Sequence, residues 1–179
     1  MKPAQNASLT ELVNYLTPNL QKLALQKALA AARAIQDEYS RAEALSALAD
    51  KLPDILPEAL AAARAIQHEY SRAEALSALA DKLPPELLLE ALAAARAIQD
   101  EDHRAYALSA FAEKLPPELL LETLVAARAI LYEDSHAEAL SALADKLPDI
   151  LPEALAAAKA IQDEYSRVIA LSALADKLP

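Results

Sequence analysis

The chain has 179 residues and a formal net charge of −10, with 27 acidic and 17 basic side chains. It contains neither Cys nor Gly, which excludes disulfides, thiol nucleophiles, sulfur-ligated metals and the Gly-rich loops of nucleotide-binding enzymes. The acidic charge argues against binding to duplex nucleic acid or to an anionic membrane, because Lys and Arg clusters hold both. No apolar run resembles a signal peptide or could span a bilayer, so we expect a cytoplasmic protein.

Residues 8–28 are predicted to be an N-terminal cap and lead-in to the rest of the chain. Ser8 and Glu11 form a capping box, in which Ser8 caps a helix and Glu11 reaches back to it. Four apolar residues of that helix share one face: Leu9, Leu12, Val13 and Leu16. Pro18 suits the first turn of a second helix, expected from about residue 19 to residue 36. We expect the helix at 8–16 to cover the open face of the repeats that follow.

Five near-identical copies of one helical hairpin make up the remainder, and the clearest copy runs from Glu58 to Pro84. The copies begin near residues 29, 60, 92, 124 and 155. In each copy an Ala-rich helix precedes a helix with an apolar stripe, for example Ala73, Leu76, Leu79, Ala80 and Leu83. One such hairpin cannot bury its apolar face alone, whereas stacked copies can. We therefore predict an all-α fold, a right-handed α-solenoid of about five antiparallel helix pairs, forming a single domain over residues 1–179.

Sequence signals mark both ends of the second helix of each copy. Capping boxes at its start are predicted from three pairs: Ser40 with Glu43, Ser71 with Glu74, and Ser135 with Glu138. A Leu-Pro pair predicts its end, because the residue before Pro is pushed out of the α region. The connectors to the next copy are PDILPE or the longer PPELLLE, and the extra residue is expected to change the local twist slightly.

The repeat of 31 or 32 residues, with SRAEALSALA in its second helix, resembles short HEAT-like repeats, including those of the bilin-lyase type. It also resembles TPR-like arrays of large cyanobacterial multidomain proteins. The resemblance covers Leu25 to Pro179 and implies a stack of helical hairpins, but no particular activity. The chain lacks the Asp-Pro and Gly residues that recur in HEAT-like repeats, and it lacks the Trp/Gly/Tyr signature of TPR repeats. No Cys supports bilin attachment. The near-identity of the copies is typical of recent duplication or deliberate engineering, and both interpretations stay open.

One basic residue recurs in the Ala-rich helix of every copy: Arg33, Arg64, Arg96, Arg128 and Lys159. Antiparallel packing is expected to place this column beside one position in the second helix of the same copy: Glu43, Glu74, Tyr106, Glu138 and Ile169. The favoured interpretation is a ladder of exposed ion pairs, each contributing about 0–1 kcal/mol. The alternative is a row of cations that grips a carboxylate-bearing peptide.

Copies three and four differ from the shared repeat sequence at the hairpin turn and in the first turn of the second helix. Because equivalent turns of neighbouring copies should lie side by side, these sequence differences predict one possible interaction patch: Asp102, His103, Tyr106, Tyr132, Asp134 and His136. Its carboxylates and imidazoles are ligand types for a divalent metal. The spacing of these residues matches no metal motif. We therefore favour sequence drift at a solvent-exposed edge of the stack over a metal site.

The second helix of copy five carries apolar residues that no following copy covers. Val168 and Ile169 stand where most other copies have Ala and Glu. An exposed apolar end tends to find a partner, most simply in a two-fold dimer. The residues predicted for this self-association are Val168, Ile169, Leu171 and Leu174. A chain cut from a longer array would explain the same feature.

These patterns favour a non-enzymatic helical-repeat scaffold or a protein and peptide interaction module, designed or duplicated, whose partner the sequence does not identify. We expect no catalytic, cofactor or metal site, since no nucleophile with an oriented base and no cofactor motif recurs. The alternative from another class is a metal-binding or hydrolytic protein that uses the Asp/His patch of copies three and four. A purely architectural segment without a ligand is the third interpretation.

Overall fold

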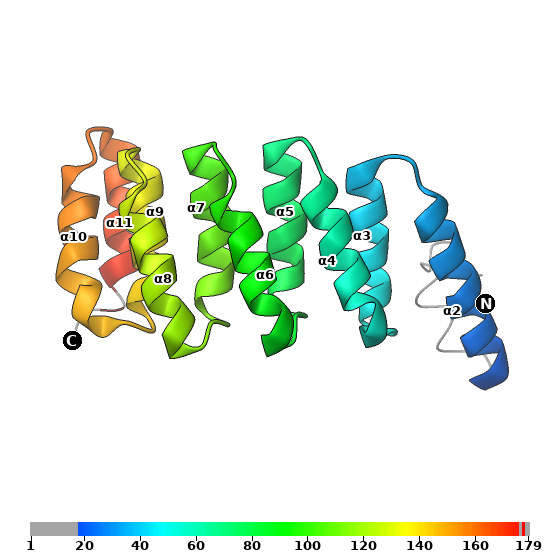
Figure 1. Ribbon diagram of the computed structural model, residues 1–179. Coiled ribbons are helices and arrows are strands. Elements are labelled where there is room, and N and C mark those ends of the chain that lie inside the picture. The colour runs from blue at the N-terminus through cyan, green and yellow to red at the C-terminus, as the bar shows by residue number, and fades with distance from the viewer. Residues whose placement is uncertain (1–17, 176, 178–179) are drawn as a thin grey trace, which may run out of the picture. The chain divides into compact units, whose positions relative to one another are not determined.

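The computed structural model describes residues 18–175 and Lys177, and this part of the chain is all-α, with ten α-helices, two short 3-10 helices and no strand (Figure 1). The predicted all-α helical-repeat fold is confirmed. The predicted capping helix at residues 8–16 lies outside the described residues. Within them, no helix combines the length and the apolar character needed to cross a membrane.

The helices alternate between the two positions of a hairpin. The first helices are α2 (Pro18–Ala34), α4 (Leu56–Ala65), α6 (Pro85–Arg96), α8 (Pro117–Arg128) and α10 (Leu151–Ala160). The second helices are α3 (Glu38–Ala49), α5 (Glu69–Ala80), α7 (Glu101–Ala112), α9 (Glu133–Ala144) and α11 (Glu164–Ala175). All five second helices have 12 residues, as expected from near-identical copies.

The chain divides into two compact units, one up to Ala65 and the other from Ile66 onward. In the first unit α3 packs against both α2 and α4. In the second unit α5, α7, α9 and α11 lie in a row in chain order, and α6, α8 and α10 each pack against the second helix before and after them (Figure 1). This is the neighbour-to-neighbour packing of a helical repeat.

The apolar stripe of the second helix is buried, as predicted. Ala73, Leu76 and Leu79 of α5 have 0% exposed surface. The first helices contribute small side chains to the same core, since Ala91 and Ala95 of α6 are also fully buried. Alanine at these positions lets neighbouring helix backbones approach closely, and the leucines fill the space that remains.

The two connector sequences fold differently. PDILPE forms a 3-10 helix before the next α-helix begins, as η1 (Pro53–Ile55) and again as η2 (Pro148–Ile150). PPELLLE enters the α-helix directly, with Pro85 or Pro117 as its first residue. Proline suits both starts because it lacks the N–H that a first turn leaves unpaired.

The predicted serine caps of the second helices are wrong by three residues. The N-cap of α3 is Asp37, whose carboxylate accepts a hydrogen bond from the Ser40 backbone N–H at 2.8 Å. Asp100 caps α7 in the same way, accepting from the His103 N–H at 3.0 Å. The serine therefore lies inside the first turn. An aspartate side chain fits the N-cap role as well as serine does, which explains the shift of register in α3.

Candidate functional site

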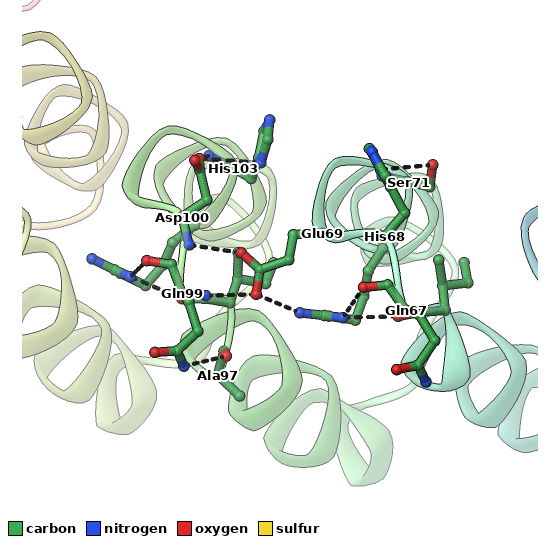
Figure 2. Close-up of polar contacts among 12 residues, drawn as sticks. Gln67, His68, Glu69, Ser71, Ala97, Gln99, Asp100 and His103 are labelled. Carbon is green, nitrogen blue, oxygen red and sulfur yellow. Dashed lines mark hydrogen bonds and ion pairs between the residues drawn. The ribbon is translucent and has the colours of Figure 1, made fainter.

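In three copies a glutamate in the first turn of the second helix bonds to the hairpin turn of the next copy. The Glu69 carboxylate accepts hydrogen bonds from the backbone N–H groups of Gln99 at 2.9 Å and Asp100 at 2.8 Å, one turn further along (Figure 2). Glu101 repeats the arrangement, accepting from the N–H groups of Leu131 at 2.6 Å and Tyr132 at 2.8 Å.

Glu133 makes the same kind of contact one copy later, accepting from the Gln162 N–H at 2.8 Å. We call these three residues, Glu69, Glu101 and Glu133, the turn carboxylates. Their contacts satisfy N–H groups that would otherwise be unpaired at a helix start, and they join copies about 30 residues apart in sequence. This role was not predicted from the sequence. The signal was available, because Glu occupies this position in all five copies.

In four of the five copies an arginine side chain bonds to a backbone carbonyl of its own hairpin turn. Arg72 donates from Nη1 to the Ile66 carbonyl at 2.8 Å, and Arg104 donates to the Ile98 carbonyl at the same distance. Copy four has His136 at this position, and its shorter side chain leaves a buried Nε2 without a hydrogen-bond partner among the described residues. The turn of copy four also lacks a side-chain cap, since Tyr132 is its N-cap.

The basic column pairs with a different partner from the one predicted. Arg33 forms two hydrogen bonds with Glu58, each 2.7 Å long, and Arg128 forms the same bidentate pair with Glu153 at 2.8 and 2.6 Å. Both glutamates lie in the first helix of the following copy, not in the second helix of the same copy. Arg96 follows this rule through Glu122, at 3.0 Å. The column is an exposed ladder between copies, which agrees with the ion-pair interpretation and corrects its geometry.

The residues of the predicted patch contact several different helices. Asp102 of α7 accepts a short hydrogen bond from the Ser135 hydroxyl of α9. His103 lies on the other side of α7, where its ring meets the edge of Tyr70 of α5 at a centroid distance of 5.4 Å. Its Nδ1 lies 3.1 Å from Asp100 Oδ1. Tyr106 is exposed.

The copy-four residues of the patch also point to different surroundings. Tyr132 is exposed at the turn and binds Glu101 through its backbone N–H. Asp134 faces a groove toward α11. His136 acts electrostatically on Glu153 of α10, where Arg128 first and His136 more weakly hold the pKa of the Glu153 carboxyl below its ordinary value. The structure therefore brings Asp102 and Ser135 together and gives the predicted patch residues different immediate neighbours.

The groove beside Asp134 lies between α9 and α11 and encloses about 460 Å³. Alanines from both helices line it, among them Ala137, Ala170 and Ala173, with Ile169 and Tyr165 beside them. Glu138 also lines it, and partial loss of hydration together with the nearby Asp102 charge raises the pKa of its carboxyl. Asp134 and Glu138 form no ion pair within the described part of the chain.

The far end of this groove is closed by a paired cation. The Lys177 ammonium donates to the Ser141 carbonyl at 2.7 Å and to the Asp145 carboxylate at 2.8 Å. Because Lys177 is already neutralised, the charge that the groove offers to a ligand is negative. The arrangement is an apolar channel with two carboxylates at one end.

The residues predicted for self-association differ in exposure. Val168 is 60% exposed and Ile169 is 55% exposed, so both present apolar surface on α11. Leu171 is half-buried. Leu174 has no exposed surface and belongs to the core, so it is not available to a second copy.

Among the residues that the structure describes, no group of three or more His, Asp or Glu side chains is arranged to hold a metal ion.

Replacing one turn carboxylate should weaken the chain more than the same change at the last copy. Glu101→Ala removes two charged hydrogen bonds to the next turn and should lower the free energy of unfolding by about 1–2 kcal/mol in urea titrations. Glu164→Ala is the matched control, because Glu164 starts α11 at the same position and bonds to no further turn within residues 18–175. Equal effects of the two variants would show that the turn contact does not stabilise the stack.

The Glu69 contact should also appear in the pH dependence of stability. The N–H groups of Gln99 and Asp100 hold the pKa of the folded-state carboxyl below its ordinary value. The contribution is therefore complete above the unfolded-state pKa, about 4.3, and is lost as pH falls through the lower folded-state pKa. The difference in melting temperature between wild type and Glu69→Gln should be largest at pH 7 and should vanish near pH 2. Glu118→Gln, an exposed first-turn glutamate of α8, should show no such trend. A difference in melting temperature between wild type and Glu69→Gln that stays constant with pH would contradict the proposed contribution of the Glu69 carboxylate.

Comparisons with protein-family models, with curated proteins and with solved structures found no match. The described helices themselves show the class of fold, an all-helical repeat in which helices pack in neighbouring pairs.

Proposed function

We propose that this protein is a non-enzymatic helical-repeat scaffold, of HEAT-like or TPR-like type, that binds a helical segment of another protein in the groove between α9 and α11. The observation that supports the proposal is the groove itself, an apolar channel floored by alanines and bordered by Asp134 and Glu138. A floor of small side chains leaves room for the larger side chains of a ligand. Helix-in-groove recognition uses this kind of surface.

The chemistry of the groove defines the class of ligand. Its alanines favour apolar side chains, and two carboxylates that form no ion pair within the described residues favour Lys or Arg at one end. Because partial burial first and the Asp102 charge second raise the pKa of the Glu138 carboxyl, a ligand cation would offset an existing electrostatic cost. The preferred ligand is therefore an amphipathic helix with an apolar face and flanking basic residues.

The hydrolytic or metal-binding alternative has less support. It needs Asp102, His103, Asp134 and His136 to converge, but Asp102 bonds to Ser135 and His103 lies against Tyr70 and Asp100. A second copy of the chain is the other candidate occupant, since Val168 and Ile169 expose apolar surface on α11 beside the groove. We propose this homodimer as the competing use of the same helix, and a cytoplasmic location suits either use.

The proposal predicts selective binding of a basic amphipathic peptide to the full chain. A fluorescent helical peptide with Leu on one face and Lys at its flanks should bind with a micromolar Kd by anisotropy, and a peptide with Glu in place of Lys should not. Glu138→Lys should weaken binding at least tenfold. Glu118→Lys, the same change at an exposed site on α8, should leave the Kd unchanged.

Three results separate the possibilities. Equal binding of the two peptides, or no effect of Glu138→Lys, would refute the groove proposal. A dimer by light scattering that Val168→Asp converts to a monomer would favour self-association instead. Zinc-dependent hydrolysis lost in His103→Ala would favour the enzyme alternative.

A further inference from the structure

Three large apolar side chains on the first helices of copies three and four remain exposed. Leu121 and Val125 of α8 are 61% and 62% exposed, and Leu89 of α6 is 57% exposed. Leu121 and Val125 lie one helical turn apart, on the same face of α8. Helices α6 and α8 lie side by side in the second unit and are joined by the ion pair of Arg96 with Glu122 at 3.0 Å (Figure 1). We call Leu89, Leu121 and Val125 the outer stripe.

The outer stripe is specific to these two copies. The connector PPELLLE places Leu89 and Leu121 where the connector PDILPE places Pro57 and Pro152. Val125 stands where each of the other four copies has alanine. A single exposed apolar residue is ordinary in a folded protein, but a group of them on adjoining helices indicates a surface that a partner covers.

The charges that flank the stripe on α8 identify a second copy of the chain as that partner. Four exposed residues follow one another at intervals of three, four and three positions: Glu118, Leu121, Val125 and Arg128. This is the spacing of the seam residues in a coiled coil, so the four residues share one face of the helix. When two such faces meet antiparallel, Leu121 lies opposite Val125 of the second copy, and Glu118 lies opposite Arg128 of the second copy. The face is therefore complementary to itself.

The same charges select the direction of the pairing. In a parallel pair, Glu118 would lie opposite Glu118 of the second copy and Arg128 opposite Arg128 of the second copy, and like charges across an interface repel. The antiparallel pair brings opposite charges together at both ends. The sequence of α8 thus favours one of the two possible orientations.

Helix α6 has the same order of acid, apolar and basic residues. Glu86, Leu89, Ala93 and Arg96 hold the equivalent positions of the preceding copy, and all four are exposed. A two-fold axis that runs across both helices relates α6 to α6 and α8 to α8. One antiparallel dimer therefore satisfies both helices at once.

Both charged residues of α8 are available for the contact. Glu118 is exposed and forms no ion pair within the described residues. Arg128 uses Nε and Nη2 to bind Glu153, and its Nη1 makes no hydrogen bond in the part of the chain that the structure describes. Because a guanidinium has donors on all three nitrogens, Arg128 can bind Glu118 of a second copy without giving up Glu153.

We propose that the protein forms a two-fold dimer in which α6 and α8 pack antiparallel against the same helices of a second copy. Each chain contributes two helices of 12 residues, which gives about half the area of a standard interface. We therefore expect a weak dimer with a Kd of about 10–100 µM, and a monomer at concentrations well below it. The proposal is independent of the groove between α9 and α11, because the groove contains no residue of α6 or α8.

Sedimentation equilibrium of the full chain, at concentrations on both sides of the expected Kd, tests the dimer. Val125→Asp should raise the Kd about tenfold or more, because it buries a carboxylate in an apolar contact on each chain. Val168→Asp is the matched control, since it makes the same change at a valine of α11 that is 60% exposed, against 62% for Val125. It should leave the Kd unchanged. Both variants should keep the circular dichroism of wild type, because neither side chain belongs to the core.

Cysteine cross-linking tests the direction of the pairing, since the chain has no cysteine of its own. Under mild oxidation, a mixture of Leu121→Cys and Val125→Cys chains should form disulfide-linked dimers faster than either variant alone. The reason is that the antiparallel dimer brings position 121 of one chain to position 125 of the other, and a disulfide requires this proximity.

Three results would overturn the proposal. A monomer at every concentration would show that the outer stripe does not bind a second copy. A dimer that Val168→Asp dissociates, and that Val125→Asp does not, would assign self-association to α11. Cross-linking that is faster for Leu121→Cys alone than for the mixture would contradict the antiparallel arrangement.

Discussion

The structure depends on one constraint: a hairpin of two short helices has more apolar surface than it can bury by itself. The solution is visible in α5, whose Leu76 and Leu79 are fully inaccessible because α6 and α7 pack against that helix. Alanines in the first helices keep the helices close enough for these leucines to fill the space between them. Stability is therefore shared between neighbours and does not belong to single copies.

Polar contacts fix the register between neighbouring hairpins. The turn carboxylates Glu69, Glu101 and Glu133 each bind backbone N–H groups of the next turn, which fixes where one hairpin stands along its neighbour. The arginine ladder does the same on the first helices, but its partners are exposed and contribute less. Copy four has lost two of the local turn contacts, the arginine clamp and the side-chain cap. It retains the inter-copy contact from Glu101, and its Ser135 gains the bond to Asp102.

The apolar stripe within each copy was predictable from sequence, whereas the polar contacts between copies were not. The stripe of Ala73, Leu76 and Leu79 follows from helical periodicity alone, so its burial could be predicted. The partner of Arg128 could not, because Glu138 and Glu153 are both plausible until the neighbouring helix is placed. The recurring Glu at the turn was visible in the sequence, but its partners, backbone N–H groups of the next copy, could not be identified until that copy was placed. The groove between α9 and α11 depends on how these two helices pack, and the spacing of residues in the sequence does not encode that.

The most direct test of shared stability is the helicity of one copy alone. A synthetic peptide of residues 85–112, which spans α6 and α7, would be compared with the full chain by circular dichroism during heating. If neighbours supply the burial, the peptide should be largely unfolded at 25 °C and should show no cooperative transition, while the full chain melts cooperatively. A peptide that is fully helical and melts cooperatively would contradict the claim that stability is shared.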